Sequence, residues 1–218
     1  MAQQNVKQDV KQSKHGGEQY FNATPTSADV RVPHTFTVRG HEVQVNTSHG
    51  VFSADRVDLG TQVLLRHAPD LPETGTFLDL GSGWGPIALA MALDAPDARV
   101  YAVDVNERSI DLTRENAQAN GCANIVAGTA QDVPDDVRFA RIWSNPPIRI
   151  GKEALHELLM TWLPRLEPDG YAYLVVQKNL GADSLMPWLA QQLGDEYEVS
   201  KYSSSKGYRV IEVHRVAA

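Results

Sequence analysis

The turn after one predicted strand is rich in hydrogen-bond acceptors and poor in donors. It reads Trp143-Ser-Asn-Pro-Pro-Ile-Arg-Ile-Gly151, and its two prolines, Pro146 and Pro147, fix an extended backbone without an N–H to donate. The remaining acceptors are the side-chain oxygen of Asn145 and the carbonyl of Pro146. Such a pair suits a ligand that offers an NH2 group, because each oxygen can accept one of the two hydrogens.

The chemistry open to such a bound amine is attack on an electrophile. An exocyclic amine of a nucleobase is a poor nucleophile, because its lone pair is delocalised into the ring. Two acceptors that hold its hydrogens pull the nitrogen toward a tetrahedral geometry and aim the lone pair. This is catalysis by positioning and electrostatics, without a dedicated general base. Asn-Pro-Pro by itself is equally typical of an ordinary turn, so its position in the fold decides whether it indicates a binding site.

A glycine-rich turn, Asp79-Leu-Gly-Ser-Gly-Trp-Gly85, follows the apolar run Thr76–Leu80 and precedes the helix former Pro86–Leu93. This order brings backbone N–H groups and a helix N-terminus together, and glycine lets a ligand approach the backbone closely. The spacing is GxGxG, neither the dinucleotide pattern GxGxxG nor a phosphate-binding loop. Asp104, at the end of the next strand, lies about 20 residues further on, the separation typical of an acid that binds ribose hydroxyls.

Two acids near this turn have open roles. Asp79 either holds a cationic amine or orders the loop. Asp132 follows the third strand and suits an adenine amino group, or it is a solvated loop acid beside Asp135 and Asp136. The glycines themselves have a packing turn as their alternative, which the placement of Asp104 disfavours.

Strands and helices alternate from residue 76 onward, which predicts a doubly wound α/β fold with a mostly parallel, seven-stranded, Rossmann-like sheet. The predicted strands are Thr76–Leu80, Arg99–Val103, Asn124–Ala127, Ala140–Trp143, Tyr171–Val176, Tyr197–Tyr202 and Tyr208–His214. The predicted helices are Pro86–Leu93, Glu107–Asn120, Lys152–Leu166 and Ala182–Leu193. Only a short polar stretch separates the last two strands, so we expect them to be antiparallel.

The part before residue 69 has a different pattern. Residues 1–20 lack apolar periodicity and the apolar core of a secretory signal, and are predicted to be a flexible tail. Residues 21–68 are predicted to form an extension of the domain at 69–218. This extension has a hairpin over Thr35–Val45 around Arg39-Gly40 and a helix over Asp55–His67.

The composition excludes several classes of protein. The 218 residues include one cysteine (Cys122), which excludes a disulfide scaffold and a Cys-rich zinc site. The histidines show no ligand spacing, so we predict no metal. No apolar run approaches the roughly 20 residues of a membrane span, and we expect a cytoplasmic protein.

The formal net charge of −7 is unevenly distributed. Residues 1–68 hold 7 basic and 6 acidic side chains, residues 69–140 hold 4 and 12, and residues 141–218 hold 9 of each. A polyanionic partner must therefore avoid the middle third, whereas the last third does not repel it.

Together these residues resemble the class I S-adenosylmethionine-dependent methyltransferases. More narrowly, they are similar to the small methyltransferase domain group that includes ribosomal RNA small subunit methyltransferase C. The matching stretches are Gly50-Val-Phe-Ser-Ala-Asp-Arg-Val-Asp-Leu-Gly60, Asp79–Gly85, Val103-Asp-Val-Asn106, Asn145-Pro-Pro-Ile148 and Lys206-Gly-Tyr-Arg-Val210. The resemblance implies S-adenosyl-L-methionine as cofactor, and residues 69–218 as the methyltransferase catalytic domain.

The resemblance also implies roles for single residues. The implied cofactor-binding set is Asp79, Gly81, Ser82, Gly83, Asp104, Asn106, Asp132 and Asn145. Within it, Asp79, Gly81 and Gly83 hold the methionine part, Asp104 the ribose, and Asp132 lies near the adenine. Asn145, Pro146 and Pro147 are the implied catalytic residues at the target amine.

Two departures from the group concern the substrate. The residue after the prolines is often aromatic and stacks on a flipped base, but here it is Ile148. We expect Phe52 to supply the ring, with a core Phe as the alternative. The second departure is that longer members carry an additional N-terminal domain, which leaves the exact substrate open.

Arg149 and Lys152 lie beside the predicted pocket and suit RNA phosphates, with a solvated surface as the alternative.

The leading hypothesis is methyl transfer to an exocyclic amine of a base in RNA, in particular a guanine 2-amino group in small-subunit ribosomal RNA. The partner would be ribosomal RNA or a ribosomal particle. The alternatives are a protein glutamine amide, a small-molecule amine, or a degenerate fold that binds RNA or a partner without catalysis. Tyr usually follows Asn-Pro-Pro in the glutamine enzymes, so Ile148 argues against the first alternative. The intact Gly81, Gly83, Asp104 and Asn145 argue against the last.

Overall fold

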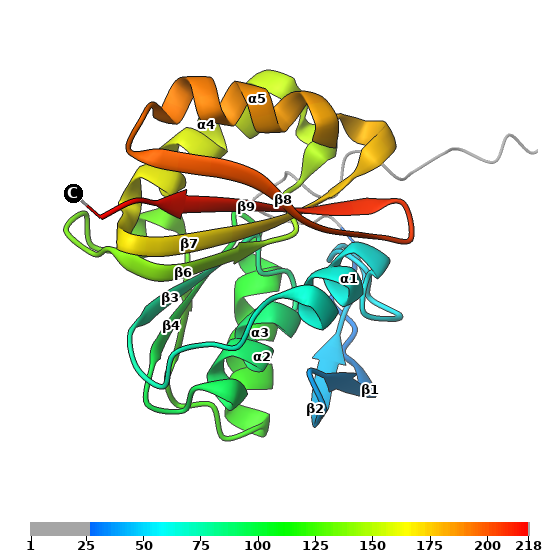
Figure 1. The fold of residues 1–218 in the computed structure, drawn as a ribbon. Helices are drawn as coiled ribbons and strands as arrows, with labels where there is room; N and C mark the ends of the chain where they lie inside the picture. Colours follow the sequence, from blue (N-terminus) through cyan, green and yellow to red (C-terminus); the bar gives the residue numbers. More distant parts are fainter. Residues whose placement is uncertain (1–26, 218) are drawn as a thin grey trace, which may run out of the picture.

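A seven-stranded sheet forms the middle layer of the computed structural model, which describes residues 27–217 (Figure 1). The strand order is β5-β4-β3-β6-β7-β9-β8. The strands are β3 Thr76–Leu80, β4 Arg99–Val103, β5 Ile125–Gly128, β6 Phe139–Ser144, β7 Leu166–Gln177, β8 Tyr197–Ser205 and β9 Tyr208–Arg215. β3 to β7 are parallel, and β9 runs antiparallel to β7 and β8. The predicted fold class and the antiparallel final pair are confirmed.

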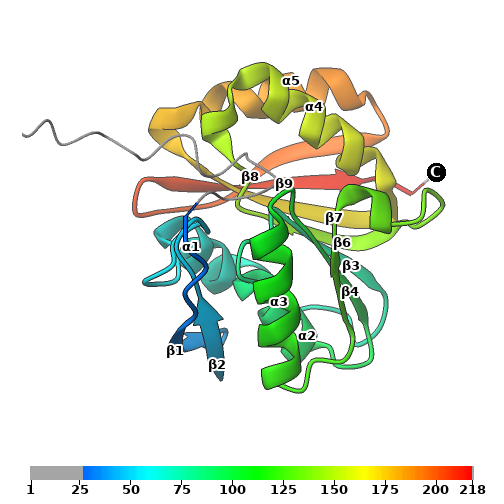
Figure 2. The same ribbon diagram turned by 180° about the vertical axis from the view of Figure 1, so that it is seen from behind.

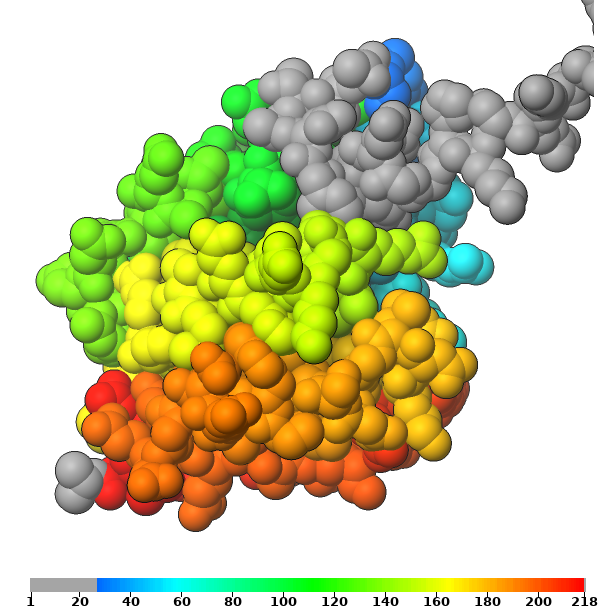
Figure 3. All heavy atoms as spheres, turned by 90° about the horizontal axis from the view of Figure 1, so that it is seen from above, coloured from blue at the N-terminus to red at the C-terminus, as the bar shows by residue number. Residues whose placement is uncertain are grey.

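Helices cover both faces of the sheet. The helices are α1 Leu59–His67, α2 Pro86–Asp94, α3 Glu107–Ala119, α4 Lys152–Trp162 and α5 Ala182–Leu193. The first three lie on one face of the sheet, and α4 and α5 cover the other. The view from above in Figure 3 shows the side that α4 and α5 form. A separate core fills each side, which explains why the central strands are apolar on both faces. Within residues 27–217, no helix is long and apolar enough to cross a membrane.

Two predicted helix boundaries are wrong. The helix predicted from Asp55 begins at Leu59, because the Asp58 side chain caps it by accepting the N–H groups of Gly60 and Thr61. The helix predicted to continue to Leu166 ends at Trp162. A short 3-10 turn containing a proline follows it, and Leu166 already belongs to β7.

A hairpin of β1 Val32–Val38 and β2 His41–Thr47 packs beside α3, as predicted around Arg39-Gly40 (Figure 2). The Asn116 side chain of α3 accepts the backbone N–H of Asn46 at 2.7 Å and donates to its carbonyl at 3.0 Å. Asn120 makes the same two bonds to Gln44. These amides satisfy the exposed edge of β2 as a further strand would. The predicted tail over residues 1–20 lies outside the described part.

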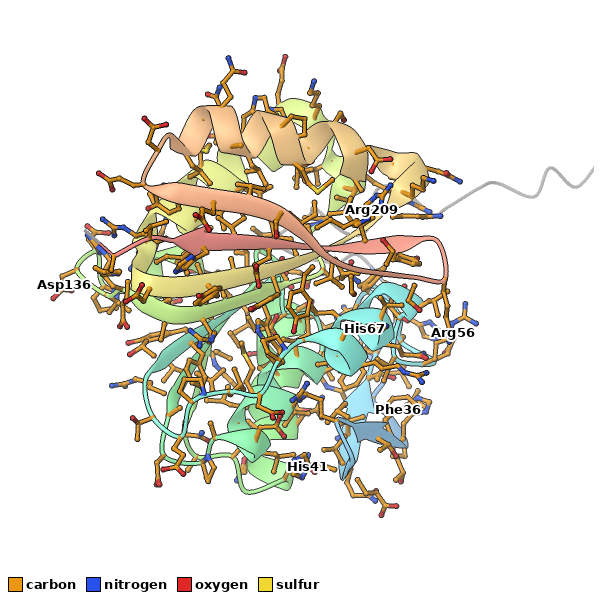
Figure 4. The ribbon with its side chains drawn as sticks, viewed as in Figure 1. Phe36, His41, Arg56, His67, Asp136 and Arg209 are labelled. Atoms are coloured by element: carbon orange, nitrogen blue, oxygen red, sulfur yellow. The ribbon has the colours of Figure 1, made fainter. Side chains whose placement is uncertain are left out.

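Arg39 anchors the hairpin to the helices. Its guanidinium donates to the carbonyls of Leu65 and Ala68 at the end of α1, at 3.0 and 2.9 Å, and pairs with Asp94 at the end of α2. It also lies over the ring of Trp143. Figure 4 shows His41, which also contacts Asp94, at the same end of α2. The Arg39 side chain is only 12% exposed. We therefore expect the hairpin to lose much of its attachment to α1 and α2 when Arg39 is removed.

We expect Arg39→Ala to lower the free energy of unfolding by about 3 kcal/mol, because it leaves the largely buried carboxylate of Asp94 without its guanidinium partner. The control is Arg66→Ala, on the exposed face of α1, which should change stability by no more than about 0.5 kcal/mol. Urea denaturation measures both. Equal losses in the two variants would contradict the anchoring role of Arg39.

Candidate active site

A cavity of about 560 Å³ opens at the carboxyl ends of β3, β4 and β6. The chain passes from β3 to β4 on one side and later returns to β6 on the other, and such a switch point is where open α/β sheets bind ligands. Ten of the predicted site residues line the cavity: Phe52, Gly81, Gly83, Asp104, Asn106, Asn145, Pro146, Pro147, Ile148 and Arg149. The topology therefore brings the glycine turn and the Asn-Pro-Pro turn to one place.

The glycine turn shapes one wall of the cavity. Gly81 and Gly83 have φ angles of +80° and +57°. A Cβ atom built on Gly83 would meet nothing within 4 Å, and one on Gly81 would meet only Cδ of Pro147, at 3.9 Å. Side chains at these positions would therefore project into the open space of the cavity. The backbone forms a cradle with room for a ligand, as a cofactor at this place requires.

Asp104 joins this cradle to the end of β4. Its carboxylate accepts the N–H of Gly83 and the N–H of Asn106, both at 2.9 Å. Burial raises the pKa of the carboxyl group. Asp104 lines the cavity directly after the strand, which is the position where an acid can reach ribose hydroxyls.

Asp79 lies beneath the cavity and is not part of its lining. Its side chain is fully buried, and Oδ2 accepts the N–H of Ala88 in the first turn of α2 at 2.9 Å. Burial, together with the nearby charge of Asp104, raises the pKa of Asp79 to about 8. This bond joins the end of β3 to the first turn of α2, while Oδ1 has no hydrogen-bond partner among the described residues.

Three other predicted binding residues lie outside the main lining. Asp132 is exposed, and its carboxylate accepts the N–H and hydroxyl of Thr129, which lower its pKa. Ser82 is buried and borders only a small adjoining recess of about 20 Å³. Lys152 is exposed in the first turn of α4. Each is close in sequence to residues that line the cavity, but none of the three is part of the lining itself.

Asn106 lines the cavity with a side chain that is already engaged. Its oxygen accepts the N–H groups of Arg108 and Ser109 as the cap of α3, and its Nδ2 donates to the carbonyl of Gly50 at 3.1 Å. Asn106 therefore joins the loop after β4 to the segment before α1. This contact shapes the cavity through the backbone.

Asn145 is held by two residues that sequence reasoning missed. Its Nδ2 donates to Oδ2 of Asp58 at 2.9 Å and to Oγ1 of Thr61 at 3.1 Å. A carboxylate can only accept hydrogen bonds, so the group that faces Asp58 must be the NH2 of the amide. Both amide hydrogens are thereby used, and Oδ1 remains as an acceptor. Asp58 belongs to the matching stretch Gly50–Gly60, but the helix predicted from Asp55 hid its place at the N-terminus of α1.

The second predicted acceptor is partly occupied. The Pro146 carbonyl accepts the N–H of Ile148 at 2.8 Å, although a carbonyl oxygen has two lone pairs and keeps one for a ligand. The bond to Ile148 fixes the direction of the carbonyl. The turn therefore offers two oriented acceptors, Asn145 Oδ1 and Pro146 O.

Two aromatic rings line the cavity. Phe52 is 38% exposed and so is not a core residue. Tyr208, at the start of β9, was not predicted as a site residue although it lies in one of the matching stretches. Its ring packs against Gly60, where a Cβ atom would lie 3.0 Å from Cε1. Burial and the charge of Asp58 raise the pKa of Tyr208.

A glycine cradle after β3, an acid after β4 and Asn-Pro-Pro after β6 define a class I S-adenosylmethionine-dependent methyltransferase. The chain belongs to the methyltransferase small domain family, whose family model matches residues 42–212. The resemblance found in the sequence is confirmed. The protein is an enzyme with S-adenosylmethionine as its cofactor.

Among curated relatives, the uncharacterized protein YbxB of Bacillus subtilis is 34% identical, over 91% of this chain and 99% of its own length. Ribosomal RNA small subunit methyltransferase C of Aeromonas hydrophila is 36% identical over 59% of this chain. Ribosomal RNA large subunit methyltransferase G of Streptomyces avermitilis is 32% identical over 62%. The chain spans only 36% and 37% of the lengths of these last two proteins.

A solved structure supports the fold. The T. thermophilus 16S rRNA N2 G1207 methyltransferase, in complex with AdoMet and guanosine, superposes with a TM-score of 0.74 at 24% identity. The match covers 88% of this chain and 52% of that one.

Gly83→Ala should weaken the binding of S-adenosylmethionine about tenfold, because the new methyl group enters the cradle. Gly121→Ala is the matched control: Gly121 also has a positive φ and open space around it, and it lies outside the cavity lining. Both changes should cost about 1–2 kcal/mol of stability for the left-handed backbone. Calorimetric titration with the cofactor should separate them. Similar affinities in the two variants would exclude the cradle as the cofactor site.

The raised pKa of Asp79 predicts a dependence of stability on pH. Since the folded protein binds this proton more tightly than the unfolded chain, stability falls as pH rises from about 4 to about 8. In Asp79→Asn the position stays neutral and can still accept from Ala88, so the melting temperature should fall less over this range. Asp97→Asn, at an exposed position, is the control. Parallel profiles for wild type and Asp79→Asn would refute the prediction.

Proposed function

We propose that the protein transfers a methyl group to an exocyclic amine of a base in ribosomal RNA, specifically the 2-amino group of guanine. The observation that carries this proposal is the orientation of Asn145, whose Nδ2 is held by Asp58 and Thr61. Its Oδ1 and the Pro146 carbonyl then present acceptors to an NH2 group. The ribosomal RNA methyltransferases among the relatives, and the guanosine complex of the structural neighbour, support this substrate.

Different residues of the chain bind the cofactor and orient the target amine. When bound, S-adenosylmethionine supplies a methyl group on a positively charged sulfur. Gly81 and Gly83 leave room for it, and Asp104 is placed to bind its ribose hydroxyls. Asn145 and Pro146 accept the two amine hydrogens and aim the nitrogen lone pair at the methyl carbon. The N–C bond forms, the electron pair of the C–S bond stays on sulfur, and one amine proton passes to water.

The charged surface near the cavity is compatible with RNA. Arg149 is exposed and lines the cavity, and Lys152 is exposed two residues after the 3-10 turn that follows the prolines. Arg56 is exposed in the loop that carries Phe52 (Figure 4). Arg209, by contrast, pairs with Asp183 of α5. We propose that the three exposed cations hold phosphates beside the flipped base.

Asn145→Ala should lower methyl transfer at least about 100-fold, the usual loss when a positioned catalytic group is removed, while cofactor affinity stays nearly unchanged. Thr61→Val keeps the Asp58 contact and should have a smaller effect. Transfer of a tritiated methyl group to ribosomal subunits, naked ribosomal RNA and total protein measures both. Label found only in protein would contradict the RNA substrate, and full turnover by Asn145→Ala would contradict the role of the turn.

A further inference from the structure

Asp58 has one carboxylate oxygen to spare. Oδ2 accepts three N–H groups, from Gly60 at 2.7 Å, from Thr61 at 3.3 Å and from Asn145 Nδ2 at 2.9 Å. No donor to Oδ1 is found among residues 27–217. Asp58 lines both the main cavity and the small recess beside the glycine turn. A charged acceptor therefore stands next to the amide that receives the target amine.

Three acceptors, Asn145 Oδ1, the Pro146 carbonyl oxygen and Asp58 Oδ1, match the hydrogen-bond donors on one edge of guanine. The Watson–Crick edge of guanine presents the 2-amino group directly beside N1–H, so neighbouring positions all donate. Adenine presents its 6-amino group beside N1, which accepts. A carboxylate has no hydrogen to offer, so it would meet the N1 lone pair of adenine with repulsion. An acceptor in a cavity that is left unpaired by the wrong ligand discriminates between ligands.

We propose that Asp58 is a specificity-determining residue that accepts the N1–H of guanine through Oδ1, while Asn145 and Pro146 hold the 2-amino group. This inference rests on the proposed function and adds the group that separates guanine from adenine at the same site. A flipped base is usually recognised in this manner, by hydrogen bonds to its Watson–Crick edge.

Close packing keeps Asp58 beside Asn145. Gly60 lies between them, and a Cβ atom there would be 3.0 Å from Asp58 Oδ2, 3.3 Å from Asn145 Nδ2 and 3.0 Å from Cε1 of Tyr208. Only glycine leaves the three side chains in contact. Tyr208 and Phe52 add rings to the same cavity, where Ile148 replaces the usual aromatic residue. The acceptor pair is thus fixed by packing before a base arrives.

The test compares two nucleosides that share the 2-amino group and differ in the N1–H and the 6-oxo group, and the variant at Asp58 assigns the preference to N1. The protein is saturated with S-adenosylhomocysteine, and equilibrium dialysis measures the binding of guanosine and of 2-aminopurine riboside, which keeps the 2-amino group but has no N1–H. Wild type should bind guanosine about tenfold more tightly. Asp58→Asn retains a good helix cap and an oxygen for Asn145, but replaces Oδ1 with NH2, so the preference should disappear or reverse. Thr61→Val keeps the carboxylate and should keep the preference.

Two results would overturn the inference. One is that wild type binds both nucleosides equally well, or binds neither of them. The other is a loss in Asp58→Asn that is the same for both nucleosides, which would make Asp58 a positioning residue for Asn145 only. The proposed function is judged separately, by methyl transfer to ribosomal RNA, so an RNA methyltransferase without the nucleoside preference would refute only the role of Asp58.

Discussion

The hydrogen bond from Asn145 to Asp58 joins two parts of the chain that are 87 residues apart and completes the site. Asp58 caps α1, which lies outside the repeating strand–helix pattern and packs on β7 and β9. Arg39 fastens the other end of α1 to the hairpin and α2. The N-terminal extension therefore holds the Asn145 amide in one orientation, in which Nδ2 donates to Asp58 and Thr61 and Oδ1 is left for the proposed target amine.

Four of the twelve acidic residues in the middle third have a structural use. Asp79 and Asp104 accept backbone N–H groups around the glycine turn, Asp94 pairs with Arg39, and Asp132 caps its own loop. These carboxylates are directed at the protein, and Asp104 among them holds the backbone of Gly83 in the cradle. The strongly negative segment is thus compatible with the proposed contact to RNA on the side that carries exposed cations.

The sequence predicted the features that depend on local patterns. Alternating apolar runs, the glycine-rich turn between a strand and a helix, and the Asn-Pro-Pro turn after a strand were all correctly placed, because each depends on nearby residues. Contacts between residues far apart in the sequence could not be predicted from it. Asp58 and Tyr208 reach the cavity only through tertiary packing, and sequence alone does not reveal that Asp79 is buried under α2. The early end of α4 was missed because its apolar pattern runs on into β7.

The orientation of Asn145 toward a bound amine is the central claim. A crystal structure of the protein with S-adenosylhomocysteine and guanosine tests it most directly. We expect the 2-amino nitrogen of guanine within about 3.2 Å of both Asn145 Oδ1 and the Pro146 carbonyl oxygen, with Asn145 Nδ2 still bound to Asp58. Guanosine bound away from the Asn-Pro-Pro turn, or an Asn145 side chain that donates to the base, would contradict it.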